Sequence, residues 1–514
     1  MNVRKAILVL VCSLIVPRAQ AENPFRLLAS ESSNGTLLVV INHALHEQYG
    51  CTYPLTYQLN LPPGSAGLLA MKRYGGNDAW KLLPAKTSQD FFNAIEAVRF
   101  DYASGKAYAS VAFSAATDSL FIQIVDSLSN PVAVQYEGIC RLYDNRVAAV
   151  TATADDYSDW VSSGASSSGI DMNAVLNVCR SYNLYVTVGV ITNPVYTSGG
   201  SWALLQQQVD SGYIEVASHS RNHLPTPYDS SAFSSYTSAV GEVIGSMQDI
   251  KTNLILPPLF SMGGIQYVYT WIAPYGDYDA VVDSLVGTGG YLTARLYANL
   301  STAAPREYVY GDSTFANWDS QRNHFAPFFP SVELGAPSWG GGDTSASSLN
   351  GLYDEIVANG DLYHFMWHPQ VVYTDVNKAY FRQHLSYISN RKNIWYANLG
   401  HIYLYRLLQT ANNSVGVAAV GRQENAPATI QLFQNYPNPF NPSTTIRYEL
   451  PTSSTVMLNV YDILGREVAV LVNETQKPGT YELRFDGSKL ASGVYFYRLQ
   501  AGSFVQTKRF LILR

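Results

Sequence analysis

Four residues of this 514-residue chain have the types and the spacing of a hydrolytic metal centre. His219 and His223 lie four residues apart, so both imidazoles can face one point, and Asp155 and Asp156 form a carboxylate pair earlier in the chain. Two imidazoles and one carboxylate leave coordination positions open for water and substrate, as in catalytic zinc sites. Adjacent acids are usually solvated surface, and histidines at this spacing also occur by chance, so each half has to be judged by its surroundings.

Both halves follow apolar segments that are typical of buried strands. Asp155 and Asp156 come after residues 146–153, and His219 comes after residues 213–218. Polar residues at the carboxyl ends of parallel strands are where α/β sheets and barrels build their sites. We therefore expect one edge of a sheet to bring the two halves together.

The chain between these strands has the pattern of two helices and a further strand. We expect a helix over residues 171–179, a strand over 184–191 and a second helix over 201–212, which gives a β-α-β-α-β order. A later apolar segment, 362–367, ends at His368. A histidine in such a place is more often a packing or rim residue than a catalytic one, unless other motifs accompany it.

With these motifs in this order, residues 146–409 resemble the polysaccharide deacetylases of the NodB-homology family, carbohydrate esterase family 4. The resemblance implies a distorted (β/α) barrel, one divalent metal ion held by three side chains, a general base, a general acid and three substrate-binding residues. The implied metal ligands are Asp156, His219 and His223, the base is Asp155 and the acid is His368. The implied substrate-binding residues are Tyr157, Pro274 and Tyr275.

The reaction of that family explains why these residue types are needed. Removing an acetyl group from nitrogen or oxygen requires a polarised carbonyl, an activated water and a proton for the leaving group. A divalent ion supplies the first two, while the base and the acid move the protons. Two histidines and one carboxylate suit zinc, which we expect, and also cobalt or iron.

The chain departs from the family pattern at two motifs. Ile272 stands where the family has an arginine that pairs with the base. Without that arginine, Asp155 would be held less firmly and the pKa of its carboxyl would rise, unless Arg295 or Arg322 reaches it from elsewhere. The family's acid-and-tryptophan motif can be placed at residues 318–319 by order alone.

The amino terminus has the pattern of a secretory signal peptide. Arg4 and Lys5 precede an apolar run from Ala6 to Val16, and a small-x-small cleavage site ends at Ala21. This run is too short to span a bilayer, and no later stretch reaches the roughly 18 apolar residues that a transmembrane helix needs. We expect an exported chain without a transmembrane segment.

The carboxyl terminus resembles the type A sorting domain of the type IX secretion system over residues 429–514. The resemblance rests on the run Asn435–Pro442, the short alternating strands after it, and the segments 464–468 and 490–497. It implies contact with the type IX machinery, passage across an outer membrane, and release or surface attachment. The alternative is an adhesive or carbohydrate-binding module.

Length and composition favour several modules and exclude some partners. A net charge of −6 without a basic stripe disfavours nucleic acid. The oligomeric state has no signature. The expected modules are a signal peptide (1–21), an N-terminal β-sandwich (22–145), the deacetylase domain (146–410), a linker (411–428) and a small C-terminal β-sandwich (429–514).

Other candidate residues have simpler explanations. Cys51 and Cys140 bracket the N-terminal region, and we expect them to form a disulfide in an oxidising compartment. Cys179 is expected to be buried and unpaired. His43 and His46 fit surface or packing positions better than a ligand set.

Two functions follow from the sequence. The first is a secreted, metal-dependent deacetylase acting on a polysaccharide, above all one containing N-acetylglucosamine, with acetylated xylan or another acetyl ester as variants. The second is a weak or inactive barrel that binds glycan, which the isoleucine at position 272 suggests. The intact set of acids and histidines favours the first.

Overall fold

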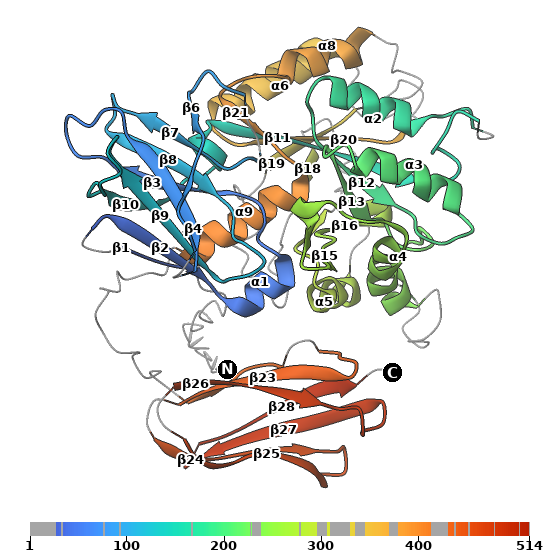
Figure 1. Cartoon of the computed structure of the whole chain (residues 1–514). Helices are drawn as coiled ribbons and strands as arrows, with labels where there is room; N and C mark the ends of the chain where they lie inside the picture. Colours follow the sequence, from blue (N-terminus) through green and yellow to red (C-terminus); the bar gives the residue numbers. More distant parts are fainter. Residues whose placement is uncertain are drawn as a thin grey trace, which may run out of the picture. The chain divides into compact units, whose positions relative to one another are not determined.

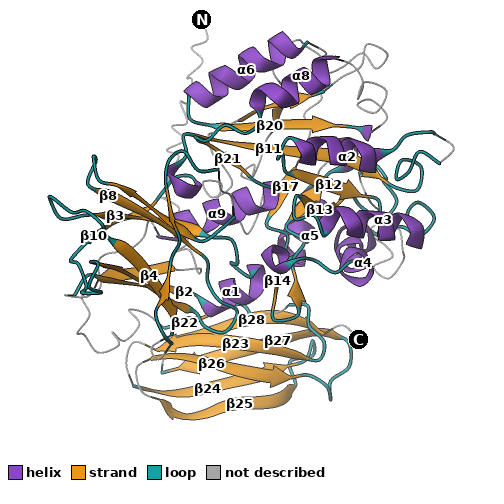
Figure 2. Cartoon of the chain, turned by 45° about the horizontal axis from the view of Figure 1, so that its top comes forward, coloured by secondary structure: helices purple, strands orange, loops and turns teal. Residues whose placement is uncertain are grey.

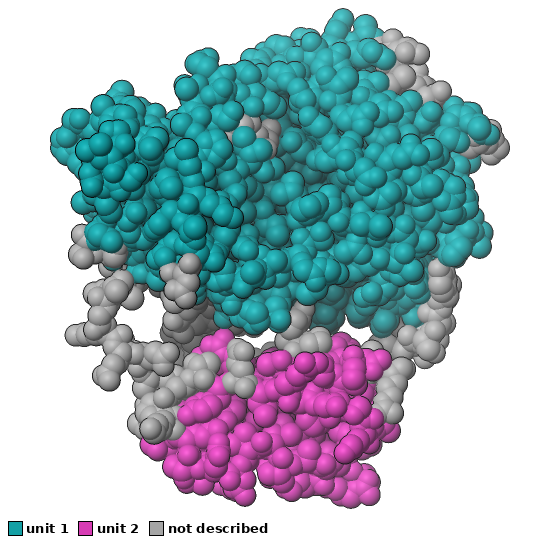
Figure 3. Space-filling model, viewed as in Figure 1, with its two compact units in different colours: residues 1–418 teal, residues 419–514 magenta. Residues whose placement is uncertain are grey.

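The computed structural model folds into two compact units, residues 1–418 and 419–514 (Figure 3). The predicted signal peptide, Trp318, Asp319 and Arg322 lie outside the residues that the structure describes. Those residues are 27–31, 34–75, 78–91, 94–165, 168–226, 228, 238–276, 279–295, 306–308, 329–334, 345–369, 379–412, 430–435, 438–450, 453–476, 479–502 and 504–512.

The first part of unit 1 consists of two mostly antiparallel sheets, drawn in blue shades in Figure 1. Their strand orders are β1-β2-β9-β4-β5 and β10-β3-β8-β7-β6. Strands β2, β8 and β9 cover residues 36–41, 106–111 and 119–125 of this part. The elements are β1 (Leu27–Glu31), β2 (Thr36–Ile41), α1 (His43–Tyr49), β3 (Leu55–Asn60), β4 (Leu69–Tyr74), β5 (Lys81–Leu82), β6 (Ala85–Lys86), β7 (Ala97–Asp101), β8 (Lys106–Val111), β9 (Ser119–Val125) and β10 (Gln135–Ile139).

The second part of unit 1 is built on a largely parallel sheet that curls into half a barrel (Figure 2). Its strand order is β17-β16-β13-β12-β11-β20-β19-β18, and β21 also pairs with β11. The strands are β11 (Ala148–Tyr157), β12 (Val186–Val190), β13 (Ile214–Ser218), β16 (Thr270–Ile272), β17 (Thr293–Arg295), β18 (Arg306–Tyr308), β19 (Phe329–Glu333), β20 (Leu362–Trp367) and β21 (Ile394–Tyr396). A small hairpin, β14 (Ser261–Met262) and β15 (Ile265–Gln266), lies apart from this sheet.

Helices connect these strands in the predicted alternating order. The helix expected from residue 171 begins there because the Asp171 side chain accepts a hydrogen bond from the Ala174 amide at 2.9 Å, which caps the first turn. Val175, Leu176 and Cys179 form its buried face. The helices are α2 (Met172–Ser181), α3 (Gly199–Val209), α4 (Ser246–Asn253), α5 (Ala280–Gly289), α6 (Ala346–Ala358), α8 (Ala379–Ile388) and α9 (Leu399–Asn412). Among the described residues, we find no helix with the length and hydrophobicity of a transmembrane span.

The two parts of unit 1 share one hydrophobic core rather than meeting through a linker. The Trp395 indole donates to the Tyr53 hydroxyl at 2.8 Å, and the Tyr269 hydroxyl donates to the Tyr49 carbonyl at 2.6 Å. From α9, the Tyr405 hydroxyl donates to the carbonyl of Cys140 at 2.9 Å. Because these bonds are buried, the N-terminal sheets and the parallel sheet stabilise each other.

The predicted disulfide between Cys51 and Cys140 is wrong, because both thiols are free and buried. The Cys140 sulfur faces Gln58 Oε1 at 3.8 Å at the end of β10, and burial raises the pKa of this thiol to about 12. Cys51 packs into the core directly after α1. Cys179 is buried and unpaired, as expected.

Unit 2 is entirely β in its described residues and has a hydrophobic core of its own. Its sheets have the orders β22-β23-β26 and β25-β24-β27-β28. On the N-terminal side, α9 runs two residues into the predicted linker, to Asn412. The strands are β22 (Gln431–Leu432), β23 (Ser443–Leu450), β24 (Ser454–Tyr461), β25 (Glu467–Gln476), β26 (Gly479–Asp486), β27 (Gly493–Ala501) and β28 (Phe504–Ile512).

A buried carboxyl group fastens α9 to the parallel sheet. Glu215, on β13, accepts hydrogen bonds from the hydroxyls of Thr187 at 2.6 Å and Thr270 at 3.0 Å, and from the Gly400 amide at 2.9 Å. A Cβ at position 400 would lie 2.2 Å from the carboxylate, so only glycine allows this approach. Burial, partly offset by these hydrogen bonds, raises the pKa of Glu215 from 4.5 to about 7.

This pKa predicts a stability effect with a definite sign. Because the folded-state pKa lies above the unfolded value, the folded protein binds the extra proton, and this contribution to stability is lost as the pH rises through about 7. Glu215→Gln can keep the three hydrogen bonds without a charge. We expect urea unfolding to show that the unfolding free energy of E215Q minus that of wild type increases by on the order of 3 kcal/mol from about pH 5 to pH 8.

The matched control for this prediction is Glu355→Gln, which makes the same chemical change at an exposed position of α6. Its unfolding free energy should follow that of the wild type at each pH. An E215Q variant whose stability tracks the wild type across this range would contradict the prediction.

Candidate metal centre

The sequence-predicted ligands and catalytic residues lie at the carboxyl ends of neighbouring strands. β11 pairs in parallel with β12 and β20, and β13 pairs in parallel with β12 and β16. Ala154 is opposite Trp367, and Ser218 is opposite both Val190 and Trp271. The residues that follow these positions therefore emerge from one edge of the sheet.

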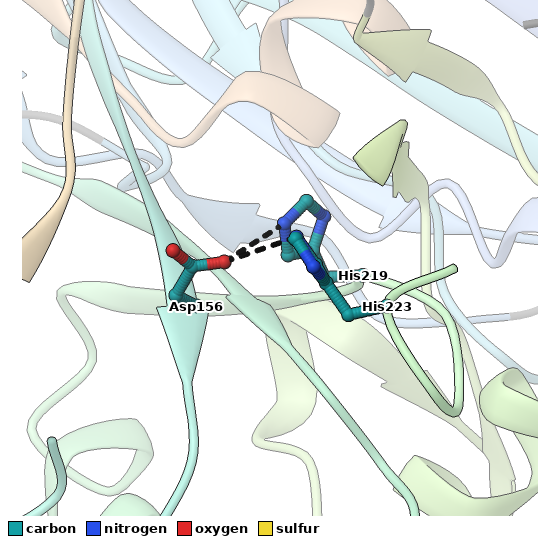
Figure 4. A group of neighbouring side chains, drawn as sticks. All are labelled: Asp156, His219 and His223. Carbon is teal, nitrogen blue, oxygen red and sulfur yellow. Dashed lines mark ion pairs between the residues drawn. The ribbon is translucent and has the colours of Figure 1, made fainter. Parts of the chain in front are cut away.

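Asp156, His219 and His223 form a compact group of possible metal ligands (Figure 4). Oδ1 of Asp156 lies 3.3 Å from Nε2 of His219 and 3.2 Å from Nε2 of His223, and one ligand atom from each residue lies within 4.8 Å of the others. Ligands bound tetrahedrally at roughly 2.0–2.1 Å from an ion are separated from one another by roughly 3.3–3.4 Å. The distances within the group therefore fit one tetrahedral ion with ligand distances of roughly 2.0–2.1 Å.

The orientation of His219 adds chemical evidence for a cation. Its Nδ1 lies 2.9 Å from the carbonyl oxygen of Ile272, and because a carbonyl only accepts, Nδ1 carries the proton. When the ring carries its proton on Nδ1 alone, as a metal ligand must, Nε2 turns a lone pair toward the carboxylate of Asp156. Two lone pairs at this distance repel each other, and a cation between them removes the repulsion.

Hydrogen bonds to the Ser220 hydroxyl and to a buried acid, Glu242, hold the loop that carries His223. The Ser220 hydroxyl accepts from the His223 amide at 2.8 Å, while Glu242 accepts from the amides of Arg221 at 2.9 Å and Asn222 at 3.0 Å. Ser220 and His223 have positive φ angles of 65° and 54°. These bonds stabilise an otherwise strained backbone that turns both imidazoles toward one point.

Arg221 anchors the other side of this loop and does not face the ligand group. Its guanidinium donates to both carboxylate oxygens of Asp249 on α4, at 2.7 and 2.9 Å. A Cβ at Gly245 would lie 2.5 Å from this guanidinium, so a larger residue there would displace the Arg221 side chain from Asp249. Asp249 also accepts from the Thr192 hydroxyl at 2.8 Å, which ties the loop to the end of β12.

Arg295, one of the two arginines considered in the sequence as partners of Asp155, reaches this carboxylate. From β17, its guanidinium binds both oxygens of Asp155, with a distance of 2.7 Å from Nη1 to Oδ1 and a second bond from Nη2 to Oδ2. Nη1 also donates to the Thr153 hydroxyl at 2.8 Å. The open alternative that Arg295 reaches the carboxylate is therefore confirmed, and Asp155 is firmly held.

The local backbone separates the two acids into two environments. The pairing of β11 with β12 shifts register between Ala154 and Tyr157, and Asp156 has a φ of 65°. This irregularity directs the Asp155 side chain toward Arg295 and the Asp156 side chain toward the histidines. Burial raises the pKa of Asp155, but the charge and hydrogen bonds of Arg295, together with the neighbouring His219 and His368, outweigh this effect, so the pKa lies below its ordinary value. Burial likewise opposes ionisation of Asp156, yet the imidazoles of His219 and His223 that face it place the pKa of that carboxyl well below its ordinary value.

The remaining predicted residues take different positions. His368 follows β20 at this edge, with Nε2 at 3.9 Å from Oδ2 of Asp155. Tyr275 is 61% exposed, and its ring lies 4.5 Å from that of His223. Pro274 is buried, and so is Tyr157, whose hydroxyl donates to the Ser201 carbonyl at 2.9 Å. The Tyr157 ring thus points into the core, and its backbone is the part that lies near the centre.

Several supporting residues had no usable signal in the sequence. Glu242 and Asp249 are isolated acids that lie 19 and 26 residues beyond His223 in the sequence. The buried His364 has its Nε2 at 3.1 Å from the Thr153 hydroxyl, and burial together with the charge of Arg295 keeps the pKa of His364 well below its ordinary value. A neutral His364 can support Thr153, and through it Arg295, without adding positive charge.

The carboxyl-terminal residues match a known family. Residues 434–513 match the family model described as a secretion system C-terminal sorting domain. This confirms the sorting domain predicted from the sequence. It indicates export, with attachment to the cell surface or secretion, and it implies interaction with the type IX machinery.

Comparison with solved structures gives distant similarities to carbohydrate-active proteins. A protein described as a polysaccharide deacetylase from Mycobacterium smegmatis is 13% identical, with coverage of 56% of this chain and 99% of that chain and a TM-score of 0.32. An endo-β-1,4-mannanase from Thermotoga petrophila is 10% identical, with 71% and 97% coverage and a TM-score of 0.21. These scores are too low to establish a shared fold or activity. A search of curated protein sequences finds no match.

The ligand group predicts binding of one zinc ion per chain. His219→Ala combined with His223→Ala removes two of the three ligands, so we expect bound zinc to disappear, as measured by elemental analysis after chelation, reloading and desalting. The matched control combines His43→Ala with His46→Ala, which also removes two histidines but lies outside the ligand group. In each of these histidines, Nδ1 lies 2.9 Å from a carboxylate oxygen of Asp118. Stoichiometric zinc in the first double variant would contradict the assignment.

The Asp155–Arg295 pair predicts a large and specific loss of stability. Arg295→Met leaves a buried carboxylate without its cation, so we expect the unfolding free energy of metal-free protein to fall by about 3–5 kcal/mol in urea. Adding Asp155→Asn should restore much of it. Arg99→Met is the matched control, because its buried partner Asp144 keeps a second ion pair with Arg146 at 2.8 Å. Equal losses in the two arginine variants, with no recovery in the double variant, would refute the argument.

Proposed function

We propose that the chain is an exported, metal-dependent hydrolase that removes acetyl groups from a polysaccharide, in the manner of the NodB-homology deacetylases. The observation that carries the proposal is the joint placement of two groups at one sheet edge. A ligand group of Asp156, His219 and His223 lies beside an arginine-bound Asp155 and the imidazole of His368. A site that only bound glycan would need neither the ligands nor a proton acceptor and donor.

Asp156, His219 and His223 would hold the metal ion, and zinc fits their chemistry and spacing. When bound, such an ion polarises the acetyl carbonyl and acidifies a water molecule. The second nitrogen of His219 donates to the Ile272 carbonyl, and this bond orients the ring. The isoleucine position therefore contributes through its backbone, and its side chain has no part in the chemistry.

Asp155 is placed to accept the proton of the attacking water. Arg295 keeps this buried carboxylate ionised and fixed, so its oxygens are available at neutral pH. His368 is partly exposed, and its Nε2 is near Asp155 on the open side of the site. It is placed to protonate the departing amine or hydroxyl.

The alternative of an inactive glycan-binding barrel rested on the missing arginine at position 272. Arg295 supplies a guanidinium to the same carboxylate from the neighbouring strand, so that reason no longer applies. The sorting domain fits an extracellular substrate. Polymers containing N-acetylglucosamine are the first candidates, with acetylated xylan as the ester counterpart.

Asp155→Asn provides the direct test. The variant should still bind one zinc ion, since Asp155 is not a ligand, but acetate release should fall by about 10²- to 10⁴-fold because general base assistance is lost. Acetate is measured with zinc-loaded protein on N-acetylated chito-oligosaccharides, acetylated xylan and a small aryl acetate.

The matched control is Asp144→Asn, which changes a buried, arginine-paired carboxylate in the turn between β10 and β11. It should cost stability but leave acetate release at the wild-type level. If the zinc-loaded wild type releases no acetate from any of the three substrates, the enzymatic proposal fails.

A further inference from the structure

Exposed apolar side chains gather on the loops that follow the strands of the metal centre. Trp160 follows β11, Tyr196 follows β12, Leu224 follows β13 and Tyr275 follows β16; their exposed fractions are 50%, 44%, 38% and 61%. Single exposed apolar residues are ordinary on a protein surface. A set that recurs on successive loops of one sheet edge is typical of a ligand-binding surface.

Hydrogen bonds hold the two loops that bear Trp160 and Tyr196 against each other. The Asp159 amide donates to the Tyr196 carbonyl at 2.6 Å, and the Asp159 side chain accepts from the Ser198 amide at 2.8 Å and the Ser201 hydroxyl at 2.5 Å. The carboxylate is thus occupied by the protein itself. The two rings are carried by a fixed backbone, which lowers the entropy cost of binding a ligand on them.

The same surface continues into the metal centre. The amides of Thr192 and Asn193 donate to the carbonyls of Ser220 and Arg221 at 3.1 and 3.0 Å, so the Tyr196 loop lies beside the loop that carries His223. On the other side of His223 lies the ring of Tyr275, at 4.5 Å. Trp160 and Tyr196 therefore lie along the edge that leads away from the ligand group.

We propose that Trp160 and Tyr196 form a stacking platform for sugar units of a polysaccharide, at a distance along the polymer from the unit whose acetyl group enters the metal centre. A pyranose ring offers an apolar face of C–H bonds to an aromatic ring, and its hydroxyl groups stay in water around the edge. Exposed, fixed rings suit such a ligand because stacking requires little rearrangement. The proposal rests on the proposed function and assigns a second contact with its polymeric substrate to Trp160 and Tyr196.

The platform makes activity depend on substrate length. A substrate of two sugar units reaches the metal centre alone, whereas one of six units also reaches the platform. Loss of both rings should therefore lower kcat/KM on N-acetylated chitohexaose about tenfold more than on the dimer. The affinity for acetylated xylan or chitohexaose should fall by a similar factor.

The experiment compares zinc-loaded, full-chain wild type with the variant Trp160→Ala/Tyr196→Ala. Acetate release is measured on the two-unit and six-unit substrates, and binding is measured in an Asp155→Asn background so that the ligand is not consumed. Tyr102→Ala is the matched control, because Tyr102 is 43% exposed on the N-terminal sheets, close to the 44% of Tyr196. Thermal unfolding of each variant checks that it is folded.

The outcomes separate the platform from the proposed function. Acetate release by wild type with an equal kcat/KM ratio in the ring variant overturns the platform and leaves the enzyme. Glycan binding that depends on the rings, without acetate release, supports the platform and rejects the enzyme. Absence of glycan binding by wild type overturns the platform. A third outcome also overturns the platform: wild type sediments as a dimer, the Trp160→Ala/Tyr196→Ala variant sediments as a monomer, and the two bind glycan equally. The surface would then join two copies of this chain.

Discussion

The buried ion pair between Asp155 and Arg295 is the constraint on which the rest of the site depends. In the strand order, β16, β13 and β12 lie between β17, which carries Arg295, and β11, which carries Asp155. In a flat sheet these two strands would lie roughly 19 Å apart, four strand spacings, far beyond the reach of an arginine side chain. The contact therefore requires the sheet to curl, and the same curl brings the ends of β11, β13 and β16 around one point. A charge pair this deeply buried is costly to form unless both partners are fully hydrogen-bonded, and both oxygens of Asp155 are.

The pair also explains how two adjacent aspartates can have different chemistry. The positive φ of Asp156 and the register shift beside it give the neighbouring side chains different partners. One carboxylate is neutralised by a fixed guanidinium and the other faces two imidazoles. If both acids shared one environment, each would raise the pKa of the other, and neither a metal ligand nor a ready proton acceptor would result. Strain in the backbone thus has a chemical consequence, and Ser220 and Glu242 support the facing loop in a comparable way.

Much of this arrangement was predictable because it is local in the sequence. Apolar runs mark the strands, and the spacing of His219 and His223 within one loop survives folding unchanged. Arg295 was only one of two candidates, because a side chain that arrives from a strand four positions away in the sheet depends on curvature, which residue patterns do not encode. The same lack of distance information made the disulfide prediction wrong, since two cysteines in one region need not approach each other. Tyr157 was predicted as a substrate-binding residue, and alternation along β11 does not reveal that its ring turns inward at the irregular end of the strand.

The free cysteines bear on how an exported protein of this kind is stabilised. Small secreted domains depend on disulfides because their cores are too small, whereas here the N-terminal sheets and the parallel sheet share one extensive core. Cys51, Cys140 and Cys179 are all buried, and burial raises the pKa of each thiol, so the reactive thiolate is suppressed at neutral pH. They behave as small apolar side chains. The buried bonds from Tyr405 and Gln409 on α9 to the Cys140 carbonyl join the two parts of the unit. Packing and hydrogen bonds therefore do in this chain what covalent links do in smaller exported domains.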